Sequence, residues 1–177
     1  MGRPRTIDRD KVLDVAEEIV RREGATALTF DAVAKAAGIT KGGLQYCFGS
    51  KDDLIAAMVE RWFVAFDAEV ARSTAADADS LEHVRGYVVT SSRIDEATQT
   101  KMAGMLVTLL QSPEYLQRVR DWYAAWIGKF GPDSAAKRRA RTAFLAAEGA
   151  FFLRSLGLVE MDQDQWDGVF GDILKLL

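Results

Sequence analysis

The segment from Thr29 to Lys51 constrains the fold more than any other part of the chain. Thr29 and Thr40 can each begin a short helix, because a threonine hydroxyl accepts hydrogen bonds from the free amides of a first helical turn. Gly38 lies between them and can adopt the left-handed conformation that ends a helix. The segment therefore predicts two short helices around a tight turn, which can place the second helix in the major groove of DNA.

The outward face of the second helix is predicted to be polar and cationic. Leu44 and Phe48 share one face at helical spacing and should turn inward. From residue 32 to residue 51 there are three lysines and no acid, although the whole chain has a net charge of −3. A local positive window in an acidic chain suits a polyanionic partner. The alternative is a helical hairpin whose polar face is simply solvated.

Residues 38–55, GITKGGLQYCFGSKDDLI, resemble the signature of the TetR family of bacterial transcriptional repressors. The matching positions are Gly38, Lys41, Gly42, Leu44, Tyr46, Phe48, Ser50, Lys51 and Leu54. The resemblance implies an all-α fold of about nine helices. A helix-turn-helix DNA-binding domain at residues 1–49 would be joined by a long fourth helix to a helical ligand-binding and dimerisation domain at residues 50–177.

The resemblance also implies the residues that contact DNA, which are Thr29, Lys41, Gly42, Gln45, Tyr46, Cys47 and Lys51. Thr29 and Lys51 would hold phosphates, and the others would face bases or the backbone. Two positions depart from the family pattern. Gln45 stands where Tyr is usual and can pair with adenine. Cys47 stands where His is frequent, and a thiol is a weak donor to phosphate. The basic residues 2–5 could reach a minor groove, or could form an unstructured tail.

Composition narrows the function classes. With one cysteine and one histidine, the chain is expected to have no intrachain disulfide and no structural zinc site. The sequence offers no nucleophile–base pair and no phosphate-binding loop, so we expect no enzyme and no cofactor. No signal peptide or long uncharged apolar run is present, so we expect no membrane span and a cytoplasmic protein on the bacterial nucleoid.

Helical spacing continues through the rest of the chain. It predicts helices at residues 8–23 and 50–73, a fifth ending near 92, a sixth ending near 110, and others at 112–131, 132–157 and 164–177. Aromatic and methionine side chains recur on these helices and predict a ligand cavity, with ordinary core packing as the alternative. The predicted cavity residues are Trp62, Phe66, Met102, Met105, Leu109, Tyr123, Trp126, Phe144, Glu148 and Phe151.

Glu148 is the only acid between residues 142 and 159. A buried carboxylate must be compensated. A bound organic cation could do so, helped by attraction to aromatic faces. The alternatives are an internal partner such as Arg141 or Arg154, or exposure at a subunit boundary.

The last helix carries an apolar seam, and the eighth helix carries small residues that allow close approach. We expect them to form a four-helix bundle between two copies of the chain, which implies a palindromic operator. The alternative is that the seam packs within its own subunit. The predicted interface residues are Ala143, Ala147, Ala150, Trp166, Phe170 and Ile173.

These patterns predict a homodimeric regulator, a repressor, that binds double-stranded DNA and is released by a small hydrophobic or cationic inducer. One rival is a helical small-molecule carrier or sensor that has lost specific DNA binding. Another is a repressor with no small ligand.

Overall fold

The computed structural model describes residues 7–75, 77–110, 113–130 and 134–177. Within these ranges the chain forms nine α-helices and one short 3₁₀ helix without any strand, which confirms the all-α prediction. The elements are α1 (Arg9–Glu23), η1 (Ala25–Ala27), α2 (Phe30–Ala37), α3 (Lys41–Phe48), α4 (Lys51–Ser73), α5 (Ser80–Ser92), α6 (Glu96–Leu109), α7 (Pro113–Gly128), α8 (Ala135–Ser155) and α9 (Gln163–Leu174).

The starts of α2, α3 and α4 follow from local side-chain chemistry. The Thr29 hydroxyl accepts from the Ala32 amide at 3.1 Å, and the Thr40 hydroxyl accepts from the Gly43 amide at 3.0 Å. Ser50 and Asp53 cap each other's backbone amides at the start of α4. Gly38 ends α2 with φ 65°, the left-handed conformation expected of it. The predicted helix pair is therefore confirmed.

The start of α8 differs from the prediction. The sequence suggests that Pro132 opens this helix, but α8 begins at Ala135, because the Ser134 hydroxyl accepts from the Lys137 amide. The preceding helix, α7, ends at Gly128 rather than at residue 131. Pro132 itself and the basic residues 2–5 lie outside the described residues.

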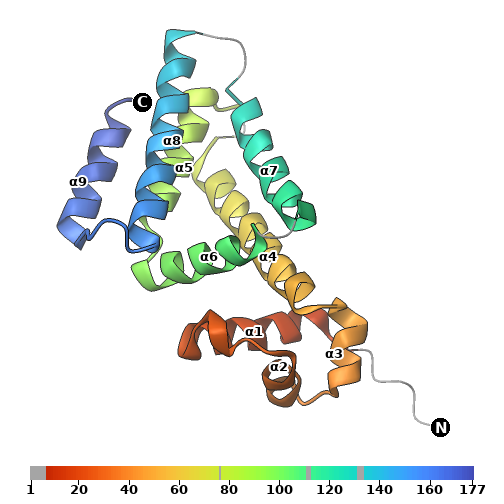
Figure 1. Cartoon of the computed structure of the whole chain (residues 1–177). Helices are drawn as coiled ribbons and strands as arrows, with labels where there is room; N and C mark the ends of the chain where they lie inside the picture. The colour runs from red at the N-terminus through yellow and green to blue at the C-terminus, as the bar shows by residue number, and fades with distance from the viewer. Residues whose placement is uncertain (1–6, 76, 111–112, 131–133) are drawn as a thin grey trace.

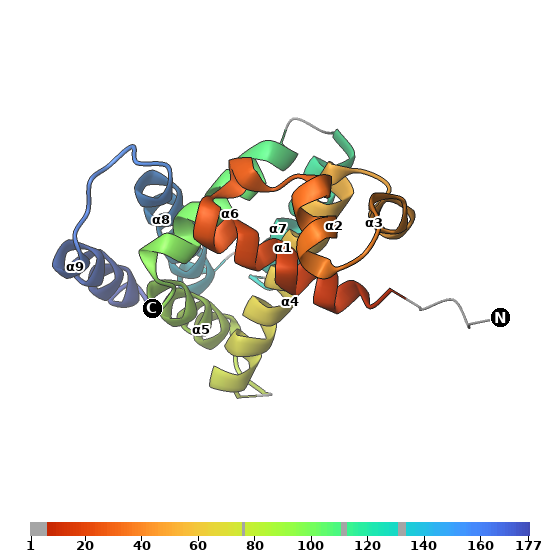
Figure 2. The same ribbon diagram turned by 90° about the horizontal axis from the view of Figure 1, so that it is seen from below.

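Helices α1–α3 form a small unit, here called the head, at one end of the molecule (Figure 1). Helix α4 runs from the head into the body, which consists of α5–α9. Helix α6 crosses the body next to the head, and α7 and α9 lie on opposite sides of α8. Seen from the head end, α1 crosses α4 and α6, and it contacts both (Figure 2).

Two apolar clusters hold this arrangement together. The first joins Val12 and Leu44 in the head to Met102 and Leu106 in α6, so the head shares a continuous core with the body. The second lies within the body and is built on α4, α5, α7, α8 and α9. Burial of the first cluster, which contains side chains of both the head and α6, fixes the head relative to the body. None of the helices described is long and apolar enough to cross a membrane.

Candidate nucleic-acid interface and aromatic cavity

Helix α3 presents a polar face to solvent and an apolar face to the head. Leu44 and Phe48 are buried, as their spacing predicts. Lys41, Gly42 and Gln45 are exposed, and the Tyr46 side chain is 91% exposed. An exposed aromatic ring on a helix held by its opposite face is available to a partner. The predicted groove-reading residues therefore share one accessible surface, although their contacts with DNA stay a prediction.

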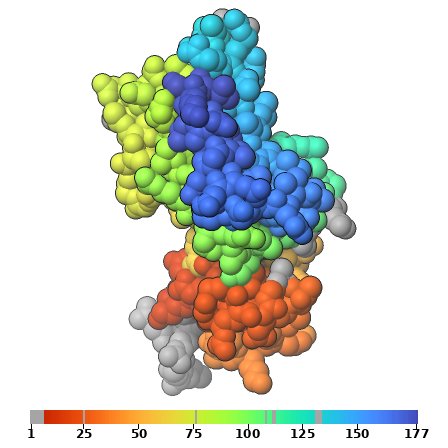
Figure 3. Space-filling view, turned by 90° about the vertical axis from the view of Figure 1, so that its left-hand side faces the viewer, coloured from red at the N-terminus to blue at the C-terminus, as the bar shows by residue number. Residues whose placement is uncertain are grey.

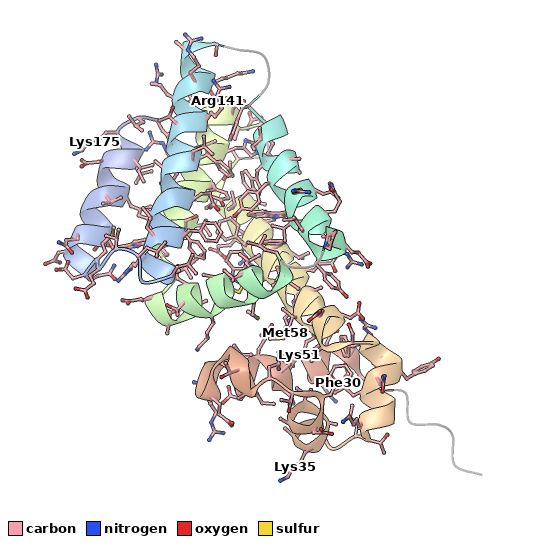
Figure 4. The ribbon with its side chains drawn as sticks, viewed as in Figure 1. Phe30, Lys35, Lys51, Met58, Arg141 and Lys175 are labelled. Atoms are coloured by element: carbon pink, nitrogen blue, oxygen red, sulfur yellow. The ribbon has the colours of Figure 1, made fainter. Side chains whose placement is uncertain are left out.

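Cationic groups stand near both ends of this surface. The Lys41 ammonium lies 3.0 Å from an Asp31 carboxylate oxygen, and both side chains are exposed. Exposed pairs contribute about 0–1 kcal/mol, so a phosphate could replace Asp31 at small cost. Lys51 is exposed in the first turn of α4, where the helix dipole also favours an anion. Figure 4 labels Lys51 beside the head, and it labels Lys35 on the outer side of the head.

Arg9 is a cation of this region that the sequence did not reveal. Its guanidinium donates to the Cys47 carbonyl and lies 4.4 Å from the centre of the Phe48 ring. Arg9 is exposed and reaches α3 from α1, across 38 residues of sequence. The Cys47 side chain is half-buried and packs against the core of the head. Arg9 is thus better placed than the Cys47 thiol to hold a phosphate beside α3.

Glu148 is half-buried in the body, and two tyrosines hold its carboxylate. The Tyr87 hydroxyl donates to one of its carboxylate oxygens, and the Tyr123 hydroxyl donates to the other. Burial raises the pKa of Glu148, and the two hydroxyl donors oppose that shift. Arg154 was one of the two arginines expected as a partner of Glu148, but its guanidinium lies 2.9 Å from a Glu96 carboxylate oxygen instead. Among the described residues, this half-buried acid is therefore compensated by neutral donors rather than by a cation.

The predicted cavity residues do not form one site. Five of them surround a void of about 10 Å³: Trp62, Phe66, Tyr123, Glu148 and Phe151. Such a void holds about one water molecule and no organic ligand without rearrangement.

The other predicted cavity residues lie elsewhere, which corrects the expectation. Trp126 and Phe144 are fully buried in the second apolar cluster because their rings pack on each other and on Tyr87. Met102 and Met105 line a separate cavity beside α1, and Leu109 lines a groove between α4 and α7.

Asp67 is a second acid among these aromatic side chains, and no local sequence pattern points to it. Its two carboxylate oxygens accept hydrogen bonds from the indole nitrogens of Trp122 and Trp126, each at 3.0 Å. The Trp122 ring also stacks on Phe63, with 4.3 Å between ring centres. These contacts fix the indoles of α7 against α4. The role of Asp67 depends on tertiary contacts, because its two tryptophan partners lie 55 and 59 residues away in the sequence.

The six predicted interface residues are buried inside their own subunit. Trp166 is 0% exposed, and its indole nitrogen donates to the Ser92 carbonyl at 2.9 Å. The buried set is Ala143, Ala147, Ala150, Trp166, Phe170 and Ile173, all in the second apolar cluster. Helix α9 lies on the outside of the body (Figure 3). Its inner face contacts α5 and α8, whose side chains cover the seam. These six side chains therefore pack within their own subunit, and a four-helix bundle between two copies, which would have to use other residues of α8 and α9, stays a prediction.

A different apolar surface remains exposed on α8. Leu145, Leu153 and Leu156 are 56%, 43% and 42% exposed, and Leu158 follows just after the helix with 68%. Leu145 and Leu153 on α8 and Leu156 at its C-cap recur at helical spacing and lie on one face together with half-buried Gly149. We call Leu145, Leu153, Leu156 and Leu158 the α8 patch. Exposed apolar side chains that share one face are a candidate site of contact with another molecule.

Comparison with known families decides the identity of the chain. Residues 12–58 match the model of "Bacterial regulatory proteins, tetR family", and residues 82–177 match that of "Tetracyclin repressor-like, C-terminal domain". The chain belongs to the TetR family of bacterial transcriptional regulators. The first match contains α2 and α3, and the second contains Glu148 and the α8 patch.

Individual known proteins resemble the chain with different sequence identities and over different shares of its length. The HTH-type transcriptional regulator BetI of Rhizobium meliloti is 22% identical over 85% of this chain and 79% of its own length. An uncharacterised HTH-type regulator in the dhlA 5′ region of Xanthobacter autotrophicus is 41% identical over 54 residues, which span 30% of this chain and only 27% of that protein. The fold is shared with the multidrug binding protein EbrR complexed with imidazole, with a TM-score of 0.68, 18% identity and 93% coverage of both chains.

Replacing Glu148 with glutamine should stabilise this TetR-family chain more at pH 8 than at pH 4.5. Because burial raises the pKa of Glu148, its stabilising contribution is complete below the unfolded-state pKa and is lost as pH rises through the folded-state pKa. Glutamine has no charge to bury, so the variant escapes this loss. We expect the difference in unfolding temperature, variant minus wild type, to grow by about 2–4 °C over this range, which thermal melts would measure.

The matched control is Glu60→Gln, an exposed acid on α4. Its effect on the unfolding temperature should change little with pH. A difference for Glu148→Gln that stays constant from pH 4.5 to pH 8 would contradict the raised pKa.

Proposed function

We propose that this TetR-family regulator is a repressor, not an enzyme, that binds a palindromic operator as a homodimer and leaves it when a small hydrophobic cation binds the body. Residues 1–49 would form the DNA-binding domain, and residues 50–177 the domain for ligand and partner. It would act on nucleoid DNA in the cytoplasm. The observation that carries the proposal is the accessible polar face of α3, with Gln45 and Tyr46 exposed and the opposite face fixed in the core of the head.

The α8 patch supports the homodimer. A second copy could cover the patch by a two-fold contact in which α8 packs on its own counterpart, with half-buried Gly149 allowing close approach. Such a dimer would carry two copies of α3. Operators of this kind present successive major grooves ~34 Å apart, so the dimer would have to hold its two α3 helices at that spacing.

The aromatic surroundings of Glu148 support a cationic inducer. An ammonium group could replace the two tyrosine hydroxyls as the partner of Glu148, and the rings of Trp62 and Phe66 could attract the same charge. Because the void holds about 10 Å³, any organic inducer must push its walls apart. Two of the residues that line the void, Trp62 and Phe66, belong to α4, and the N-terminal end of α4 follows α3 directly. Movement of α4 would then shift α3 relative to the operator.

Gln45→Ala should lower operator affinity by about 1–3 kcal/mol and relax the base preference at one position of each half-site. The reason is that an exposed amide on the groove-facing side of α3 can read a base edge directly. The measurement is a titration of the protein with a DNA fragment from upstream of its own gene, and with single-base variants of that fragment, at several salt concentrations.

Lys51→Ala provides the contrast for this measurement. It should weaken binding to every duplex by a similar factor and lower the salt dependence by about one ion, because it removes a phosphate contact. If the wild-type protein binds no native fragment more tightly than random duplex, the proposal fails, and the alternative of a small-molecule carrier without specific DNA binding is favoured. If tetraphenylphosphonium, a hydrophobic organic cation, leaves a specific complex intact, the cationic inducer fails while DNA binding stands.

A further inference from the structure

A cavity of about 460 Å³ lies where the head meets the body. Its walls come from α1, α4 and α6, and Figure 4 labels Met58 where α4 passes between the head and α6. This volume is within the range of small-molecule sites in proteins. The cavity is distinct from the void at Glu148, with which it shares only Trp62. Nothing in the proposed function uses it.

The floor of this cavity is apolar and adaptable. Met58, Met102 and Met105 line it and are almost completely buried, and Trp62 and Val20 complete the apolar surface. Methionine side chains have three rotatable bonds and a polarizable sulfur, so they adjust to flexible or irregular apolar groups. The floor therefore suits a hydrocarbon chain or a ring.

Two arginines at the rim already have carboxylate partners. Arg61 lies 2.8 Å from Asp14 and 2.7 Å from Glu17, both on α1. Arg21 donates from its Nε to Glu18 at 2.7 Å. Asp14, Glu17 and Glu18 are therefore paired with arginines, and they balance the charges of the two guanidinium groups.

Lys101 is the cation that remains. It is half-buried on α6 and lines the cavity, and its ammonium makes no ion pair or hydrogen bond to any residue in the described ranges. Its charge acts on Glu18 and Asp95, and Glu17 lines the same cavity. Asp95 is occupied as the cap of α6, where it accepts from the Thr98 amide and hydroxyl. An anion placed in the cavity would give Lys101 its missing partner.

We propose that this cavity binds an amphipathic monoanion, a carboxylate whose aliphatic or aromatic part lies on the methionine floor and whose charge pairs with Lys101. The charge of this ligand is opposite to that of the inducer proposed for Glu148. The two proposals are independent, because the sites use different charged residues. An occupant would touch α1 and α6 at the same time and so bridge the head and the body.

The test is isothermal titration of the full chain with decanoate below its micellar concentration, with 1-decanol as the neutral analogue. We expect one decanoate per chain and at least about tenfold weaker binding to Lys101→Gln. Lys101→Arg should retain the affinity to within about threefold, because it keeps the charge. The matched control is Lys175→Gln, a lysine exposed on the far side of the body, and it should bind as wild type does.

A second variant checks the location of the site. Ala65 is exposed at the cavity wall, so Ala65→Trp should fill the space without disturbing the core, and should abolish decanoate binding while the unfolding midpoint stays near that of wild type. Glu148→Gln should bind decanoate normally, which separates this site from the other. Absence of saturable binding, equal affinity of wild type and Lys101→Gln, or equal affinity for 1-decanol would overturn the proposal.

Discussion

A chain with Leu153 replaced by glutamate is expected to sediment as a monomer and to bind its operator at least about 100-fold more weakly. Leu153 lies in the α8 patch and is 43% exposed in the single chain. A glutamate there is harmless to the isolated subunit but would bury a charge, twice, in a two-fold contact across α8. A monomer keeps one α3 helix and loses the gain in affinity from simultaneous binding of two half-sites.

The matched control for this variant is Ile127→Glu. Ile127 is 47% exposed and lies on α7, on the side of α8 away from α9 (Figure 1). The Ile127→Glu variant should remain a dimer with wild-type operator affinity. Analytical ultracentrifugation at micromolar concentration measures the oligomeric state of both variants, and a binding titration measures their operator affinity. A Leu153→Glu protein that remains dimeric would place the interface on another surface.

Trp166→Ala is expected to lower the free energy of unfolding by about 3–5 kcal/mol. The Trp166 side chain is completely buried against the second apolar cluster, and its ring lies 4.4 Å from that of Phe170. Truncation leaves a cavity, and it also removes the indole N–H that donates a hydrogen bond to the Ser92 carbonyl. Both losses lower the free energy of unfolding. Urea unfolding would measure the loss.

Asp167→Ala on the exposed side of the same helix should change the stability by no more than about 0.5 kcal/mol. The contrast also separates the two interpretations of the α9 seam. If the seam were the subunit interface, Trp166→Ala would yield stable monomers. The structure instead predicts that Phe170→Glu destabilises the subunit itself, because Phe170 is only 2% exposed and packs inside the subunit.

The head was predictable because its signals are local. Caps at Thr29 and Thr40 and the left-handed Gly38 lie within three residues of the helix ends that they define, and each works without reference to the rest of the chain. The inward orientation of Leu44 followed from spacing alone. Local hydrogen bonds and helical period therefore carried both the fold of this segment and the face that α3 presents.

The body was predictable as helices but not as contacts. The period of the α9 seam shows that one face is covered, and it contains no information on whether the cover is α5 and α8 or a second subunit. The donors to Glu148 come from α5 and α7, which are 61 and 25 residues away, so no local pattern could name Tyr87 and Tyr123. The methionines of α6 were recognised as cavity residues, but their position beside α1 depends on tertiary packing.

The shared core beneath α6 has a consequence for exchanging parts between relatives. Val12 in α1 and Leu106 in α6 belong to one apolar cluster, so the head is shaped to a particular α6. Grafting the head of another regulator onto this body would transfer its base-reading surface but would also mismatch side-chain volumes across the junction. Chimaeras that preserve function therefore have to carry α6 together with the head, and drift in one should be followed by compensating drift in the other.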